Sequence, residues 1–130
     1  MSSQELDAVN LVGAAQVLLR RREFAAAERL LHRALLLFHQ TVGEDDLNCT
    51  VCLNNLGMLY HIVGDAARAE PLLREVVEIR RRLVGEAHPA YRNAVRELAD
   101  FYRSRDDEAQ AAFWQRHADG AEERLRKSSP

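Results

Sequence analysis

The most constraining feature of this chain is an internal repeat. The tripeptide Val42-Gly43-Glu44 returns as Val84-Gly85-Glu86, 42 residues later. The same period relates three pentapeptides, which are Ala14-Ala15-Gln16-Val17-Leu18, Leu56-Gly57-Met58-Leu59-Tyr60 and Leu98-Ala99-Asp100-Phe101-Tyr102. Recurrence at about 20–50 residues is typical of arrays in which each unit buries its apolar face against its neighbours. The chain is therefore expected to contain three copies of one structural unit.

Each copy has the apolar pattern of two helices. In the second copy Leu53, Leu56 and Tyr60 follow helical spacing, Gly64-Asp65 interrupts the pattern, and the pattern resumes at Ala66. The scarcity of Gly (6) and Pro (3) among 130 residues also favours helices. The predicted helices span residues 5–21, 24–41, 48–63, 66–83, 89–104 and 107–126. The expected fold class is an all-α solenoid of three stacked helical hairpins.

The expected domain organisation follows from this repeat. A single domain should span residues 1–127, because 47% of the residues are hydrophobic and a packed core is expected. Residues 128–130 should form a short disordered tail. The repeats are placed at about 5–43, 47–85 and 89–126.

Composition excludes several partners and compartments. A formal net charge of −2 argues against nucleic acid, which requires a basic excess to neutralise phosphates. The first ten residues lack a basic segment followed by an apolar core, and no apolar run approaches about 18 residues, so neither an export signal nor a membrane-spanning helix is expected. Two cysteines without an export signal favour a reducing compartment. A cytoplasmic protein that binds neither membrane nor nucleic acid is predicted.

The second copy resembles the tetratricopeptide repeat family, in the long-period form of kinesin light chains. The resemblance rests on Leu53-Asn54-Asn55-Leu56-Gly57-Met58-Leu59-Tyr60, Gly64, Ala69-Glu70-Pro71-Leu72, Ile79, Val84-Gly85-Glu86 and His88-Pro89. It covers about residues 8–126 and is weakest in the third copy. Arg22 and Asp106 stand where the family usually has glycine, which suits terminal repeats. The resemblance implies a protein-binding scaffold without catalytic activity.

A helical wheel divides residues 51–62 into two sides. Leu53, Leu56, Gly57 and Tyr60 lie together and should face the core. The resemblance implies that the opposite side lines a concave groove. In the second copy that side carries Val51, Asn54, Asn55, Met58, His61 and Ile62. The equivalent residues are Val9, Val12, Gly13, Gln16, Leu19 and Arg20 in the first copy, and Asn93, Arg96, Glu97, Asp100, Arg103 and Ser104 in the third.

Two interpretations of this side are open. The apolar residues, such as Val12 and Met58, could simply pack against neighbouring helices while the asparagines are solvated. Alternatively, the apolar patch receives side chains of a partner peptide or helix, since an apolar surface opposite a core stripe calls for something to bury it. Asn54 and Asn55 would then bind a ligand backbone through their amides. Arg96 and Arg103 would pair with acidic residues of the partner.

The sequence contains no convincing catalytic or metal-binding set. Cys49 and Cys52 have a C-x-x-C spacing, but no second pair completes a zinc site, and His61 lies too far along the same helix. His32 and His39 lack ligands on a second helix. Neither a phosphate-binding glycine loop nor a Ser/His/Asp set is present. The prediction is a protein that is not an enzyme and needs no cofactor or metal, with structural cysteines.

Three other features leave alternatives open. The arginine runs 20–22 and 80–82 lie near predicted helix C-termini and are interpreted as solvated capping residues, with a basic patch for RNA or membrane as the alternative. A homo-oligomer could form through the C-terminal hairpin, along the stripe Trp114, Ala118, Ala121 and Leu125. The chain could also be a regulatory subunit of an enzyme complex, or an inert designed scaffold.

Overall fold

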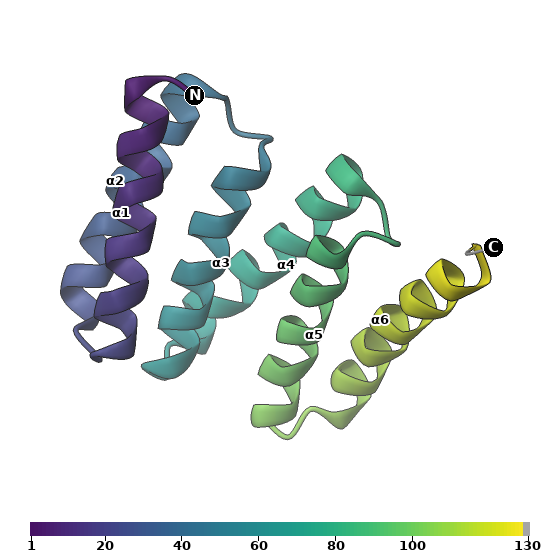
Figure 1. Cartoon of the computed structure of the whole chain (residues 1–130). Coiled ribbons are helices and arrows are strands. Elements are labelled where there is room, and N and C mark those ends of the chain that lie inside the picture. Colours follow the sequence, from purple (N-terminus) through teal and green to yellow (C-terminus); the bar gives the residue numbers. More distant parts are fainter. Residues whose placement is uncertain (129–130) are drawn as a thin grey trace. The chain divides into compact units, whose positions relative to one another are not determined.

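The computed structural model describes residues 1–128, apart from the side chains of residues 121–125 and 128. Within this part all the regular secondary structure is α-helical (Figure 1). The helices are α1 (Ser3–Arg20), α2 (Phe24–Thr41), α3 (Leu47–Ile62), α4 (Ala66–Val84), α5 (Pro89–Ser104) and α6 (Glu108–Ser128). The predicted fold class is confirmed, and each helix begins and ends within two residues of the predicted position. The tail prediction was wrong at Ser128, which belongs to α6, and residues 129–130 lie outside the described residues.

The chain divides into two compact units, Met1–Leu72 and Leu73–Pro130. In the first unit α2 packs against both α1 and α3. In the second unit α5 and α6 form a packed hairpin. The prediction of a single domain stays a prediction.

The two helices of each hairpin are joined by the same hydrogen-bonded turn. In the first, Glu23 N–H donates to Leu18 O (2.9 Å) and Arg22 N–H donates to Leu19 O (3.0 Å). The hydrogen bonds from Asp65 N–H to Tyr60 O and from Asp107 N–H to Tyr102 O repeat the bond of Glu23, which spans five residues. This is the Schellman arrangement that ends a helix with one residue in the left-handed region.

That left-handed residue is glycine in only one of the three turns. Gly64 has φ +84°, whereas Arg22 has φ 62° and Asp106 has φ 59°. A side chain at positive φ costs about 1–2 kcal/mol, which glycine avoids. The family position was therefore located correctly, and two turns adopt its geometry against the preference of their residues.

The residue after each turn begins the second helix. Asp65 Oδ1 accepts a hydrogen bond from Arg68 N–H (3.1 Å), and Asp107 Oδ1 accepts one from Gln110 N–H (3.1 Å). These carboxylates satisfy one of the free N–H groups of a helix start. Glu23 occupies the same position before α2 but makes no side-chain hydrogen bond of this kind.

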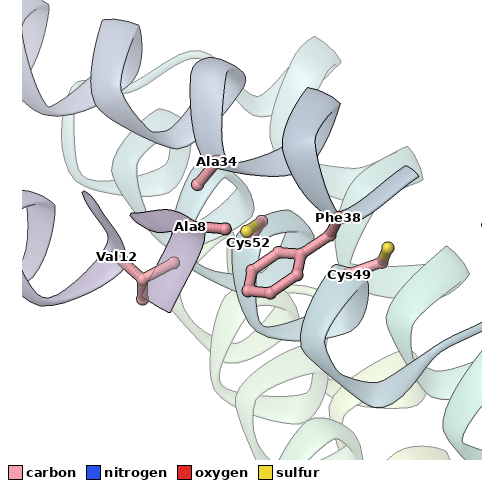
Figure 2. Packing of buried hydrophobic residues seen from close by; sticks show 6 residues of the cluster. All are labelled: Ala8, Val12, Ala34, Phe38, Cys49 and Cys52. Carbon is pink, nitrogen blue, oxygen red and sulfur yellow. The ribbon is translucent and has the colours of Figure 1, made fainter. Parts of the chain in front are cut away.

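The core of the first unit lies where α1, α2 and α3 meet. Figure 2 shows the ring of Phe38 pointing from α2 toward residues of both other helices. The cluster consists of Ala8, Val12, Ala34, Phe38, Cys49 and Cys52. Leu11, Leu35, Leu37, Val42 and Val51 are partly buried against it. Alanine and cysteine fill most of the buried positions, so the helices approach one another closely.

In the second unit, Arg80 occupies the position of Phe38 one period later and is only 8% exposed. Its Nη1 donates to the Ala90 carbonyl at 3.1 Å. Desolvation lowers the pKa of this guanidinium, and the Glu97 carboxylate opposes that shift. The interpretation of residues 80–82 as a solvated run was therefore wrong for Arg80, because the repeat turns this position inward. Arg81 is exposed and pairs with Glu78 at 2.6 Å.

Candidate partner-binding surface

The first unit contains an apolar pocket of about 260 Å³ on the predicted groove side of α1 and α3. Its walls come from Val9, Val12, Gly13, Gln16, Phe38, Asn48 and Val51. The structure brings together five residues that were predicted to line the groove, which are Val9, Val12, Gly13, Gln16 and Val51. The amides of Gln16 and Asn48 are the polar groups in this otherwise apolar lining.

The pocket exists because one wall has no side chain. A Cβ added at Gly13 would meet no atom within 4 Å, so the helix surface there opens onto empty space. Val12 and Phe38 are only 8% and 2% exposed and also belong to the core cluster. The floor of the pocket is therefore held by the same residues that stabilise the first unit.

Two lining residues were missed by the sequence analysis. Phe38 lies on the second helix of its hairpin, and nothing in the pattern of that helix indicated that its ring reaches the space beside Val12. Asn48 precedes Val51 by three residues and so shares its side of the helix. Extending the wheel by one turn toward the N-terminus would have identified Asn48.

The adjacent Asn54 and Asn55 of α3 differ in their hydrogen bonding. Asn55 Nδ2 donates to the Val51 carbonyl at 3.0 Å, so this amide is bound to its own helix. Asn54 Oδ1 is buried and has no hydrogen-bond partner within the described part of the chain. A buried acceptor left unsatisfied costs about 1–3 kcal/mol. Asn54 is thus the amide with unused hydrogen-bonding capacity.

The other predicted residues of the first unit lie outside the pocket. Met58, His61 and Leu19 are half-buried, Arg20 is exposed, and Ile62 is 47% exposed. α3 is also buried over more of its circumference than the wheel indicated. Cys52 and Leu59 join the predicted stripe with exposed fractions of 0% and 1%.

The predicted residues of the second unit lie on α5 and are polar. Asn93, Asp100 and Arg103 are exposed, and Arg96 is partly buried. Arg103 Nη1 lies 2.7 Å from Asp100 Oδ1, with both side chains open to solvent. A partner carboxylate would therefore compete with Asp100 for the Arg103 guanidinium.

Both thiols are buried and unreactive in character. Burial, followed by the neighbouring acidic side chains led by Asp46, raises the pKa of Cys49 to about 11. Burial, with a smaller effect of Cys49, raises the pKa of Cys52 to about 12. Cys49 Sγ donates to the Gly43 carbonyl at 3.1 Å. Reactive thiols have lowered pKa values, so this pair has the chemistry of core residues.

Among the described residues, no group of three or more His, Cys, Asp or Glu side chains could hold a metal ion. Within the same part of the chain, no helix combines the length and apolar character needed to cross a membrane.

The stripe suggested for self-association on α6 is wrong at Ala118, which is fully buried, while Trp114 is partly buried. Self-association through this hairpin stays a prediction. Ala121 and Leu125 lie on α6, but their side chains fall outside the described residues. The large apolar side chain that α6 does expose is Phe113, at 43%. Its ring packs edge-on against Trp114, with 5.0 Å between centroids.

Comparison with known proteins agrees with this geometry. The tetratricopeptide repeat profile matches residues 6–82 and again residues 51–118. Among solved structures, BtubC (BKLC) from P. vanneervenii superposes on 98% of this chain with a TM-score of 0.85 and 24% identity. A kinesin-light-chain-like protein from Podosopora anserina with nearly identical TPR-like repeats superposes on 100% of the chain, with a TM-score of 0.81 and 19% identity.

These structural matches are to longer proteins. The chain spans 52% of the matched BtubC chain and 62% of the Podosopora chain. Comparison with curated protein sequences finds no match. At these identities the structural likeness establishes the fold alone.

Proposed function

We propose that this chain, which belongs to the tetratricopeptide repeat family, is an adaptor whose first unit binds an apolar side chain of a partner peptide or helix. Tetratricopeptide repeats generally mediate protein–protein interaction, and proteins built from them are typically not enzymes. The proposal specifies where the partner binds, which is the pocket beside Gly13. It also specifies the chemistry of the side chain that binds there. It rests on the pocket geometry of the first unit.

The pocket carries the proposal because of its size and lining. Its volume of about 260 Å³ lies below the range of about 300–1,000 Å³ of small-molecule sites and suits a single large side chain. Anchor side chains that fill such pockets supply most of the binding energy at protein interfaces. Leucine, methionine or phenylalanine is the expected anchor, because Val9, Val12 and Val51 offer no charge to pair with a polar one.

Amide side chains on the same surface supply a second requirement. Gln16 and Asn48 lie in the pocket lining, and each amide offers both donors and an acceptor to a peptide backbone. Such hydrogen bonds would fix the register of an extended peptide whose anchor side chain is buried beside them.

The polar face of α5 would act through charge. Arg96, Asp100 and Arg103 present both signs of charge, which favours discrimination between partners over raw affinity.

The test uses a matched pair of substitutions on α1. Gly13→Leu fills the pocket, and it also favours the helix, because glycine costs about 1 kcal/mol relative to good helix formers. Ala14→Leu adds the same side chain at the neighbouring exposed position, outside the pocket lining. Peptides are first selected on the immobilised chain from a phage-displayed random library. Their affinity for each variant is then measured by fluorescence anisotropy.

The selected peptides should share a large apolar residue. Gly13→Leu should weaken their binding at least about tenfold, which corresponds to about 1.4 kcal/mol, while Ala14→Leu should bind as the unmodified chain does. Equal binding by both variants, with native helix content by circular dichroism, would show that the pocket is not the site.

A further inference from the structure

The two helices that wall the pocket of the first unit carry charges of one sign beside it. Residues 1–19 and 42–60, which include most of α1 and α3, contain no Lys, Arg or His. Their charged side chains are all acidic, namely Glu5, Asp7, Glu44, Asp45 and Asp46. Asp7 lines a separate depression together with Arg33 of α2 and is not counted further. The consecutive residues 44–46 are called the acidic turn below.

The acidic turn lies at one end of the pocket. Asn48, which lines the pocket, donates its backbone N–H to Asp46 Oδ1 at 2.8 Å. The next residue, Cys49, belongs to the core cluster together with Phe38 of the pocket lining (Figure 2). After burial, the three carboxylates of the turn are the causes that raise the pKa of Cys49, so all three lie near this cluster. Two of them, Glu44 and Asp45, are exposed to solvent, where a partner can reach them.

Glu5 lies toward the same end on α1. α1 and α3 run in the same direction, so their first turns lie at the same end of the unit (Figure 1). Glu5 precedes Val9 of the pocket lining by four residues, and the two therefore share a side of α1. The nearest cation along α1 is Arg20, which follows Gln16 of the lining by four residues. The pocket thus has an acidic end and, one turn beyond the other end, a basic residue.

We propose that the partner segment is basic, with a Lys or Arg beside its apolar anchor that pairs with the acidic turn and Glu5. The proposal rests on the function assigned to the pocket and adds the charge of the partner. Complementary charges at the rim of an interface speed association and fix register, whereas like charges disfavour binding. Arg20 also gives the segment a direction, because it would repel the basic residue from the other end of the pocket. The Lys or Arg should therefore stand on one fixed side of the anchor.

The test removes the two exposed carboxylates and keeps the Asp46 cap. Peptides are selected on the immobilised chain from a phage-displayed random library at low ionic strength, and should share a Lys or Arg on one side of the apolar residue. Glu44→Gln/Asp45→Asn should lower their association rate constant about threefold to tenfold, with a smaller change in dissociation, because rim charges act mainly on association. Stopped-flow fluorescence anisotropy measures both rate constants. Added salt should reduce the difference between variant and unmodified chain.

The control changes the net charge by the same amount elsewhere. Glu23→Gln/Glu75→Gln neutralises two exposed carboxylates that lie outside the pocket lining and outside α1 and α3. This variant should bind the selected peptides as the unmodified chain does. A peptide in which glutamine replaces the Lys or Arg should associate equally fast with the unmodified chain and with Glu44→Gln/Asp45→Asn.

The outcomes separate the charge of the partner from the pocket itself. Suppose that Gly13→Leu weakens binding, but the peptides prefer no basic residue or prefer an acidic one, or Glu44→Gln/Asp45→Asn associates as fast as the control. The pocket is then the site and the basic partner is wrong. Retention of the soluble chain in preference to the peptides, lost on Gly13→Leu, would identify a second copy as the occupant and also overturn the proposal. Equal binding by Gly13→Leu would overturn the function of the pocket and the basic partner together.

Discussion

α3 and α5 hold the same place in two successive repeats, yet only their buried sides agree. Leu56, Gly57 and Tyr60 are matched one period later by Leu98, Ala99 and Tyr102, and all are buried. On the other side, Asn54, Met58 and Ile62 are matched by Arg96, Asp100 and Ser104. Helix packing constrains the first set, because a change of volume there costs stability. The second set is free of that constraint and can acquire the chemistry of a partner.

The comparison between repeats can be tested at equivalent positions that hold different residues. Position 38 and its equivalent 80 differ in polarity while both are buried. The turn positions 22, 64 and 106 share a conformation with different residues. Five predictions follow, in order of decreasing effect.

The largest effect is expected at the equivalent positions 38 and 80. Phe38→Ala should lower the free energy of unfolding by about 3–5 kcal/mol, because it removes a buried ring at the centre of the first unit. Arg80→Met keeps volume and loses the hydrogen bond to Ala90, and should cost about 1–3 kcal/mol. Urea unfolding followed by circular dichroism gives both values. Equal losses would show that the charged position contributes as much as the apolar one.

The next experiment concerns the thiols of α3, whose positions hold Tyr91 and Ala94 in α5. A rise in pKa of two units lowers the thiolate fraction about a hundredfold. Iodoacetamide at pH 8 should therefore modify Cys49 at least about a hundredfold more slowly in the folded chain than in urea, as measured by mass spectrometry. Similar rates in both states would mean that the thiols are accessible and ionised.

The same thiols imply a pH dependence of stability. Their pKa values are raised in the folded chain, to about 11 for Cys49 and about 12 for Cys52. The thiols of the folded chain therefore stay protonated to a higher pH than those of the unfolded chain, which ionise at about pH 8.5. The stabilisation that the raised thiol pKa values give the folded chain is fully present below that pH. It is lost as the pH rises through 11 to 12. Cys49→Ala/Cys52→Ala should remove this part of the alkaline transition.

A smaller effect is expected in the turns between the helices. Arg22→Gly should raise the free energy of unfolding by about 1 kcal/mol, because glycine adopts φ 62° without steric cost. Asp106→Gly should raise the free energy of unfolding by less, since aspartate tolerates the left-handed region better than arginine does. Gly64→Ala is the reciprocal control and should destabilise the chain by a similar amount. Thermal unfolding of the three variants provides the comparison, and a loss of stability on Arg22→Gly would contradict it.

The smallest effect is expected at the start of α2. Glu23→Asp places at this position the residue that caps α4 and α6, and should stabilise the chain by about 0.5–1 kcal/mol. Asp107→Ala should cost a similar amount by removing the bond to Gln110 N–H. Denaturant midpoints decide the outcome, and an unchanged midpoint for Glu23→Asp would mean that the backbone at residue 23 does not allow the cap.

Much of the local structure was predictable from residue order. The period placed Gly64 in a turn, and the same turn occurs at Arg22 and Asp106 despite their different residues, because hydrogen bonds to the preceding helix define it. The stripe Leu53, Leu56 and Tyr60 was correctly assigned to the core. Val9 and Gln16, which were predicted to face a groove, lie in the lining of the pocket, while the groove itself stays a prediction.

The errors have a common physical cause. A helical wheel gives the angle of a residue around one helix and contains no information about what packs there. Arg80 lies in an arginine run, which is typical of a solvated surface, but the next hairpin covers its position. Ala118 was assigned to an apolar stripe of α6 open to a second subunit, yet its side chain is fully buried.

The sequence by itself determined the repeat, the six helical segments, the turn positions and the core stripe, because each depends on spacing along the chain. Tertiary structure decided which of those surfaces enclose a pocket. It placed Phe38 under the space left open by Gly13, bound Asn55 to its own helix and left the oxygen of Asn54 buried without a partner. These outcomes depend on side chains from several helices meeting in three dimensions, which spacing within one helix does not encode.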